Sequence, residues 1–150
     1  VNGPLHAFCR STTFETSTVP SDEVVTRLTQ LGEEAFAGCT SLTSVVFPDS
    51  LKQVGDTAFG DCSPLTSMVL PDSLTQLGNA AFQGCTFLTS VKLPDNPYSV
   101  TKIGEGGFED CISLTSVVLP DSLTQLGEQA IQDCTSLTSV VLPDSLTQIG

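Results

Sequence analysis

The chain repeats one nine-residue phrase almost unchanged. Leu-Pro-Asp-Ser-Leu-Thr-Gln-Leu-Gly stands at residues 70–78 and 119–127, and it returns with a single change at 142–150. Five cysteines keep a related spacing, with 23 residues between neighbours except for one interval of 26. They are Cys39, Cys62, Cys85, Cys111 and Cys134. A fixed period of this length is typical of a solenoid, in which each repeat forms one coil stacked on the next.

The repeat has a constant register that divides the chain into coils. Written from its alanine, it reads Ala-Phe-x-x-Cys-x-x-Leu-x-x-Val-x-Leu-Pro-Asp-x-Leu-Thr-Gln-Leu-Gly-x-x. We predict one repeat domain over 1–150, with a degenerate capping coil over 1–34 and regular coils over 35–150. The last coil is incomplete at Gly150 and the chain begins with Val1, so we expect a processed or partial chain.

Alternating polarity predicts one strand in each coil. The apolar positions of Leu-x-x-Val-x-Leu suit the interior, while side chains between them, such as Ser67 and Val69, point outward. Six parallel strands are expected to start near residues 14, 42, 65, 88, 114 and 137. Opposite them, residues 79–85 are long enough for one helical turn, with Phe82 and Cys85 on one face. The predicted fold class is an α/β-type repeat solenoid with coils of about 23 residues, a parallel sheet on one side and short helical or irregular turns opposite.

The order of apolar residues within the coil is distinctive. One full example runs from Cys62 to Leu70-Pro71, then through Leu74, Leu77-Gly78 and Ala81-Phe82. This pattern resembles the BspA-type leucine-rich repeat, and the resemblance covers residues 7–150, with Ser11 and Ser17 departing from it in the first unit. It implies a surface, secreted or adhesive protein, or a protein-binding scaffold, without enzymatic activity of its own. A secreted, cell-surface or organelle-lumen location is therefore favoured over the cytoplasm.

Charge and repetition exclude several classes of function. The chain has 17 acidic and 5 basic residues and a formal net charge of −12, which argues against binding to nucleic acid or anionic membrane surfaces. No apolar run approaches the roughly 20 residues of a membrane span. The only histidine is His6, and residues 113–125 and 136–148 are identical, whereas an active site needs distinct groups that converge on one point. We predict no enzymatic activity, no cofactor and no metal.

Two polar columns follow from the register. The five spaced cysteines are predicted to be buried and reduced, because parallel Cβ vectors in adjacent coils hold the Cβ atoms farther apart than the ~3.8 Å typical of a disulfide. Cys9 lies off this column, either packed in the cap or linked to another chain. The aspartates after the prolines should each bond their own turn, with a row of Ca²⁺ sites as the alternative. They are Asp49, Asp72, Asp95, Asp121 and Asp144.

The outward sheet positions and one insertion are the predicted partner contacts. Rows of serine and valine, interrupted by one lysine, form a drier strip than the acidic remainder, as interaction sites often do. The alternative is that valine only satisfies β-propensity. The 26-residue coil adds a tyrosine that either anchors a partner or folds back over Leu93 or Ile103. The predicted partner-binding residues are Ser67, Val69, Ser90, Lys92, Tyr98, Ser116 and Val118, with the open coil at Ile149-Gly150 as a further contact.

Three roles fit these features. The first is a non-enzymatic protein–protein interaction scaffold that uses the sheet face and the inserted loops. The second is an architectural accessory subunit held in a larger multi-protein assembly, which the nearly invariant coils favour. The third, by resemblance alone, is a cell-surface adhesion module. The repeat itself does not specify the partner protein, because solenoid function depends on side chains outside the repeat pattern.

Overall fold

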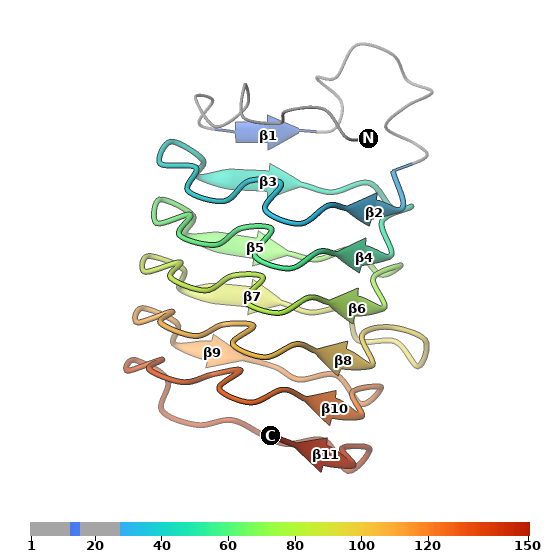
Figure 1. The fold of residues 1–150 in the computed structure, drawn as a ribbon. Helices are drawn as coiled ribbons and strands as arrows, with labels where there is room; N and C mark the ends of the chain where they lie inside the picture. The colour runs from blue at the N-terminus through green and yellow to red at the C-terminus, as the bar shows by residue number, and fades with distance from the viewer. Residues whose placement is uncertain (1–12, 16–27) are drawn as a thin grey trace.

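The computed structural model of the protein describes residues 13–15 and 28–150. These residues wind into stacked coils, and parallel strands line two sides of the resulting solenoid (Figure 1). The side predicted from the sequence holds β1 (Thr13–Glu15), β3 (Ser44–Val46), β5 (Ser67–Val69), β7 (Ser90–Lys92) and β9 (Ser116–Val117). The second side holds β2 (Gln30–Leu31), β4 (Gln53–Val54), β6 (Gln76–Leu77), β8 (Lys102–Ile103), β10 (Gln125–Leu126) and β11 (Gln148–Ile149).

Five of the six predicted strands are confirmed, but they form two sheets, β1-β3 and β5-β7-β9, in place of one. β5, β7 and β9 pair in parallel, and β1 pairs in parallel with β3. The predicted alternation also holds, since Met68 is 2% exposed and Val69 is 62% exposed. The sixth strand, expected near residue 137, is wrong because residues 137–142 form no strand. Leu142 is 48% exposed, because no further coil packs against this part of the chain in the structure.

The second side of the solenoid is also a sheet, which the sequence interpretation did not predict. Its six strands follow the order β11-β10-β8-β6-β4-β2. Each strand is two residues long, as in β6, where Gln76 is exposed and Leu77 is buried. The next residue extends the pairing, since the Gly78 amide donates to the Val54 carbonyl at 2.9 Å. Such short strands persist because neighbouring coils satisfy their backbone groups.

The glycine after each of these strands except β2 lets the coils approach closely. A Cβ placed on Gly78 would lie 2.6 Å from the carbonyl carbon of Gly55 and 2.7 Å from the amide nitrogen of Asp56. These distances are shorter than any tolerated contact with backbone atoms. The recurring glycine is therefore a packing requirement of the stack.

The connections between the two sheets are irregular turns, so the predicted helical turn at 79–85 is wrong. Ala80 and Gly84 have φ angles of 49° and 70°, a left-handed conformation that interrupts a right-handed helix. The amides of Ala80, Phe82 and Gly84 donate to carbonyls of the next coil at 2.7, 2.9 and 2.9 Å. Hydrogen bonds between coils have thus replaced those along a helix. Nothing in the described part of the chain is a helix able to cross a membrane.

A column of stacked rings runs through the core. Phe36, Phe59, Phe82 and Phe108 stack with ring centroids 5.2, 5.2 and 5.5 Å apart. The thiol of Cys85 donates to the Phe59 carbonyl of the preceding coil at 3.2 Å, and the same bond recurs in three other coils. Ile131 takes the phenylalanine position in the last turn and packs against the core. Rings and thiols together hold the coils, and hence their outer faces, in register.

Candidate functional site

The outward face of β5, β7 and β9 collects most of the predicted partner-binding residues. They are Ser67, Val69, Ser90, Lys92, Ser116 and Val118, all of them exposed. Pairing places Ser67 beside Ser90 and Val69 beside Lys92, so that the side chains form two rows across the strands. Val69 and Val118 are 62% and 73% exposed, and the strand residues of this face include no carboxylate. The result is an apolar, hydroxyl-bearing surface on a strongly acidic chain.

Two exposed apolar side chains beside this face were missed by the sequence analysis. Phe87 is 62% exposed and Ile112 is 44% exposed. They stand in the turns that lead into β7 and β9, on neighbouring coils. The signal was present in the sequence, because Ser113 occupies the position of Phe87 one coil later and Thr86 occupies that of Ile112 one coil earlier. Departures from the repeat, rather than the repeat itself, marked these residues.

The three-residue insertion holds Tyr98 in solvent. Its side chain is 85% exposed, so the alternative in which the ring folds back over Leu93 or Ile103 is wrong. The side-chain amide of Asn96 holds the loop in place through both its nitrogen and its oxygen. Its Nδ2 donates to the Asp72 carbonyl at 3.0 Å, and its Oδ1 accepts the Tyr98 amide at 3.0 Å.

A buried serine closes the same loop. The Ser99 hydroxyl lies 2.9 Å from the Pro94 carbonyl, 2.8 Å from the Asn96 carbonyl and 2.9 Å from the Ser122 hydroxyl. Because these bonds fix the loop in advance, binding through Tyr98 would cost little ordering entropy. The loop lies between β7 and β8, at the edge of the solenoid (Figure 1). The structure therefore does not bring Tyr98 onto the sheet face.

The cysteine column is buried, as predicted, and four of its members are free thiols. These are Cys62, Cys85, Cys111 and Cys134. Burial raises the pKa of Cys62 to about 11 and that of Cys111 to about 12. Burial also raises the pKa values of the Cys85 and Cys134 thiols. Thiols with such pKa values stay protonated and poorly nucleophilic near neutral pH.

The first member of the column departs from this prediction. Cys39 is disulfide-bonded, whereas its place in the column predicts a reduced thiol. The adjacent Cys62 is free, so this disulfide does not join neighbours within the column. The prediction for Cys9 lies outside the described residues.

The aspartate column is a row of exposed side chains in the turns after the prolines. Among the described residues, these aspartates make none of the predicted hydrogen bonds to their own turns, and the neighbouring serines bond carbonyls of the preceding coil. Ser50 Oγ donates to the Leu28 carbonyl at 2.8 Å, and Ser145 Oγ donates to the Leu123 carbonyl at 2.7 Å. Within the described residues, no three His, Cys, Asp or Glu side chains gather as a metal site would require.

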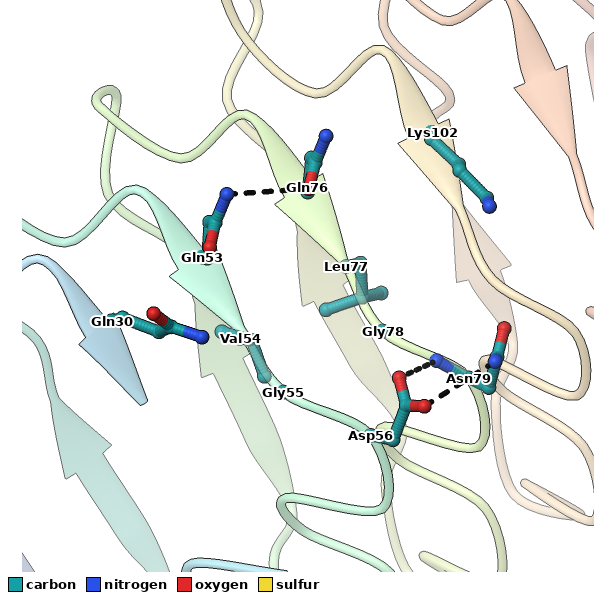
Figure 2. Close-up of a pocket in the computed structure, with 10 residues that line it drawn as sticks. All are labelled: Gln30, Gln53, Val54, Gly55, Asp56, Gln76, Leu77, Gly78, Asn79 and Lys102. Atoms are coloured by element: carbon teal, nitrogen blue, oxygen red, sulfur yellow. Dashed lines mark hydrogen bonds between the residues drawn. The ribbon is translucent and has the colours of Figure 1, made fainter. Parts of the chain in front are cut away.

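A groove on the second sheet was not predicted from the sequence. It encloses about 230 Å³ across β2, β4, β6 and β8. Figure 2 shows outward side chains along one wall, Asp56 and Asn79 on the other, and glycines between them. The outward side chains are Gln30, Gln53, Gln76 and Lys102. The sequence signal was the recurring Thr-Gln-Leu-Gly, which sets a glutamine column beside a glycine column once the coils are stacked.

Comparison with known families matches almost the whole chain. The model of the BspA type leucine rich repeat region matches residues 5–102 and 95–150, with six copies of the repeat. No curated protein sequence matches the chain.

Solved structures with the same architecture come from bacteria. A leucine-rich repeat protein from Bacteroides ovatus is 29% identical with a TM-score of 0.60, over 92% of this chain and 39% of that protein. A leucine rich cell surface protein from Faecalibacterium prausnitzii is 25% identical with a TM-score of 0.59, over 89% and 40%. The pneumococcal vaccine antigen PcpA, 24% identical with a TM-score of 0.71 over 89% and 30%, shares the fold. The chain thus spans two-fifths or less of the length of these proteins.

Proposed function

Because the chain belongs to the BspA-type leucine-rich repeat family, we propose that it is a protein-binding module whose partner lies on the outward face of β5, β7 and β9. Leucine-rich repeat proteins of this kind are generally non-enzymatic binding modules. The observation that carries the proposal is the exposed valine row on a carboxylate-free face of a chain with net charge −12. Exposed apolar strips of this kind often mark interaction sites.

The chemistry of the face defines what the partner must present. Val69 and Val118 need apolar side chains to cover them, and the serine rows can accept and donate hydrogen bonds at their margin. Lys92 is the one charged residue of β5, β7 and β9, so an acidic group on the partner should lie opposite it. Phe87, in the turn that leads into β7, is a further exposed apolar side chain. Tyr98, at the edge, offers a second and separate anchor.

An extracellular or cell-surface location agrees with two observations. A structure similar to this chain belongs to a cell surface protein of Faecalibacterium prausnitzii. Cys39 is disulfide-bonded, and disulfides persist chiefly in oxidising compartments. Both points favour export of the chain. Outside the cell, a binding module of this kind would meet other extracellular proteins.

The test compares partner capture by matched variants of the exported chain. Wild-type protein, Val69→Glu/Lys92→Glu and Tyr98→Ala are immobilised and exposed to extracellular protein fractions, and the retained proteins are quantified. Val69→Glu/Lys92→Glu should lose the specific partner, because it buries two unpaired negative charges. Gln125→Glu, an exposed change on the second sheet, is the control and should bind normally. If every variant retains the same partner, the contact lies elsewhere, most directly at the exposed Ile149 of the last coil.

An architectural role in a larger assembly is distinguished by the behaviour of the isolated chain. The identical segments 113–125 and 136–148 favour this role, since a recognition surface usually varies from coil to coil. A binding module should elute as a stable monomer in size-exclusion chromatography. An obligate subunit should aggregate when its neighbours are missing.

A further inference from the structure

The glutamine column of the second sheet lines a polar groove that lies outside the proposed protein-binding face. We propose that this groove binds a linear, uncharged saccharide, lying across β2, β4, β6 and β8 with about one sugar ring for each coil. The site is on the six-stranded sheet of β2, β4, β6, β8, β10 and β11, whereas the proposed protein contact is on the sheet of β5, β7 and β9. Its occupancy is therefore independent of the protein partner.

The glycine column lines the floor of the groove. Gly55 and Gly78 lie between the outward glutamines on one side and Asp56 and Asn79 on the other (Figure 2). The enclosed volume of about 230 Å³ is too small for a folded element. It suits a narrow chain that lies along the coils with its edges against both walls.

The far wall is held rigid before any ligand arrives. The Asp56 carboxylate accepts the Asn79 backbone amide at 2.8 Å and the Asn79 side-chain amide at 3.4 Å (Figure 2). Asn79 Oδ1 in turn accepts the Glu105 backbone amide at 3.0 Å. These bonds fix both side chains, so hydroxyl groups that meet them lose little affinity to side-chain ordering.

The opposite wall, formed by the outward glutamines and Lys102, carries hydrogen-bonding groups that can bind a ligand. Gln53 Nε2 donates to Gln76 Oε1 at 3.3 Å, which orients the two amides along the column. The next strand carries Lys102 in register with Gln76, and a lysine cannot accept a hydrogen bond. The amide chain therefore ends there, and Gln76 and Lys102 each bring a donor group to the groove from neighbouring strands. Donors and acceptors side by side on planar amides match the paired hydroxyls of a sugar ring.

Spacing and charge select a saccharide over other ligands. Coils repeat at about 4.8 Å, close to the length that each ring adds to a linear hexose chain. An extended peptide advances about 3.3 Å per residue, so its like-facing side chains fall out of step with the amide column. Lys102 offsets Asp56 within the groove, while the chain as a whole carries −12, which repels anionic ligands. A neutral, hydroxyl-rich chain meets all three conditions.

Side-chain amide signals in ¹⁵N–¹H spectra provide the test. Uniformly labelled protein is titrated with linear β-1,4-glucan, β-1,4-mannan and β-1,3-glucan hexasaccharides, with a galacturonate hexasaccharide as the anionic arm. At least one neutral chain should shift the amides of Gln30, Gln53 and Gln76 in a saturable manner at millimolar concentration. The amides of Gln125 and Gln148, in the same column but outside the groove, should stay unchanged.

Paired variants separate binding from stability. Gln53→Ala/Gln76→Ala should weaken the responsive saccharide at least tenfold, while Gln125→Ala/Gln148→Ala should bind within twofold of wild type. Both variants should keep the wild-type melting midpoint, because the replaced side chains lie outside the core. The proposal is overturned if no neutral saccharide gives saturable shifts, if only the galacturonate binds, or if both double variants bind equally. Capture through the Val69 face is expected to be the same with and without saccharide, so failure of one proposal leaves the other intact.

Discussion

Replacing Phe82 with alanine tests whether the ring column holds the solenoid together. Phe82 is fully buried, with one ring 5.2 Å away in the preceding coil and another 5.5 Å away in the next. Large-to-small changes of this kind cost about 3–5 kcal/mol. Each stacked ring pair contributes roughly 0.5–1.5 kcal/mol beyond burial, and Phe82→Ala breaks two pairs. The expected loss in the free energy of unfolding is therefore near the upper end, about 5 kcal/mol.

Two further substitutions serve as comparisons for Phe82→Ala. Phe82→Ile keeps most of the volume, as Ile131 does in the last turn, and removes only the stacking. It should cost about 1–3 kcal/mol. Phe87→Ala removes the same side chain five positions later in the sequence, where the ring is 62% exposed. It should change stability by less than about 0.5 kcal/mol.

Urea unfolding followed by far-ultraviolet circular dichroism measures all three variants. A loss of about 5 kcal/mol lowers the melting midpoint by roughly 10–20 °C in a chain of this size, which calorimetry can check. A Phe82→Ala loss below about 2 kcal/mol would refute the reasoning, because it would place the ring outside a tightly packed core. Equal losses for Phe82→Ala and Phe87→Ala would refute it as well.

Two other perturbations test the stacking and the buried thiols. Gly78→Ala should cost about 3 kcal/mol by urea unfolding, since its Cβ would meet backbone atoms at 2.6 Å, and Gly32→Ala, with nothing within 4 Å, should be nearly neutral. Equal effects at the two glycines would count against close coil contact. Cys62, whose pKa rises from 9.0 to about 11, is protonated in the fold but ionises in the unfolded chain from pH 9 upward. The contribution of this thiol to the free energy of unfolding should be fully present below pH 9 and should be lost as the pH rises toward 11. The free energy of unfolding should fall less over the same range in Cys62→Ala. A urea midpoint that stays constant across this range in the wild type would contradict the assignment.

The sequence determined the parts of this protein that depend on period and alternation. A 23-residue period can bury its apolar residues only by stacking coils, so the solenoid and the inward positions of residues such as Met68 followed directly. Alternation likewise placed Ser67 and Val69 on the outer face. The residue pattern of the family could be recognised from the sequence for the same reason, because each coil repeats the same packing contacts.

Tertiary structure alone decided the second sheet, the turns and the direction of Tyr98. A two-residue strand such as β6 has no local signal, and it exists because neighbouring coils supply its backbone hydrogen bonds. The segment 79–85 has the length of a helical turn, but alternate amides in it donate hydrogen bonds to carbonyls of the next coil. Tyr98 points into solvent because Asn96 and Ser99 bond the loop to the rest of its coil and to adjacent coils.

The groove shows the same division most clearly. The sequence contains the glutamines and glycines of Thr-Gln-Leu-Gly at fixed intervals, and nothing in one coil makes a cavity of them. Gln53 and Gln76 are 23 residues apart in the chain and become hydrogen-bonded neighbours only when two coils stack. Repetition along the sequence therefore determined which residues recur. Packing between coils decided which of them meet, because contacts across the stack are long-range and carry no local signature.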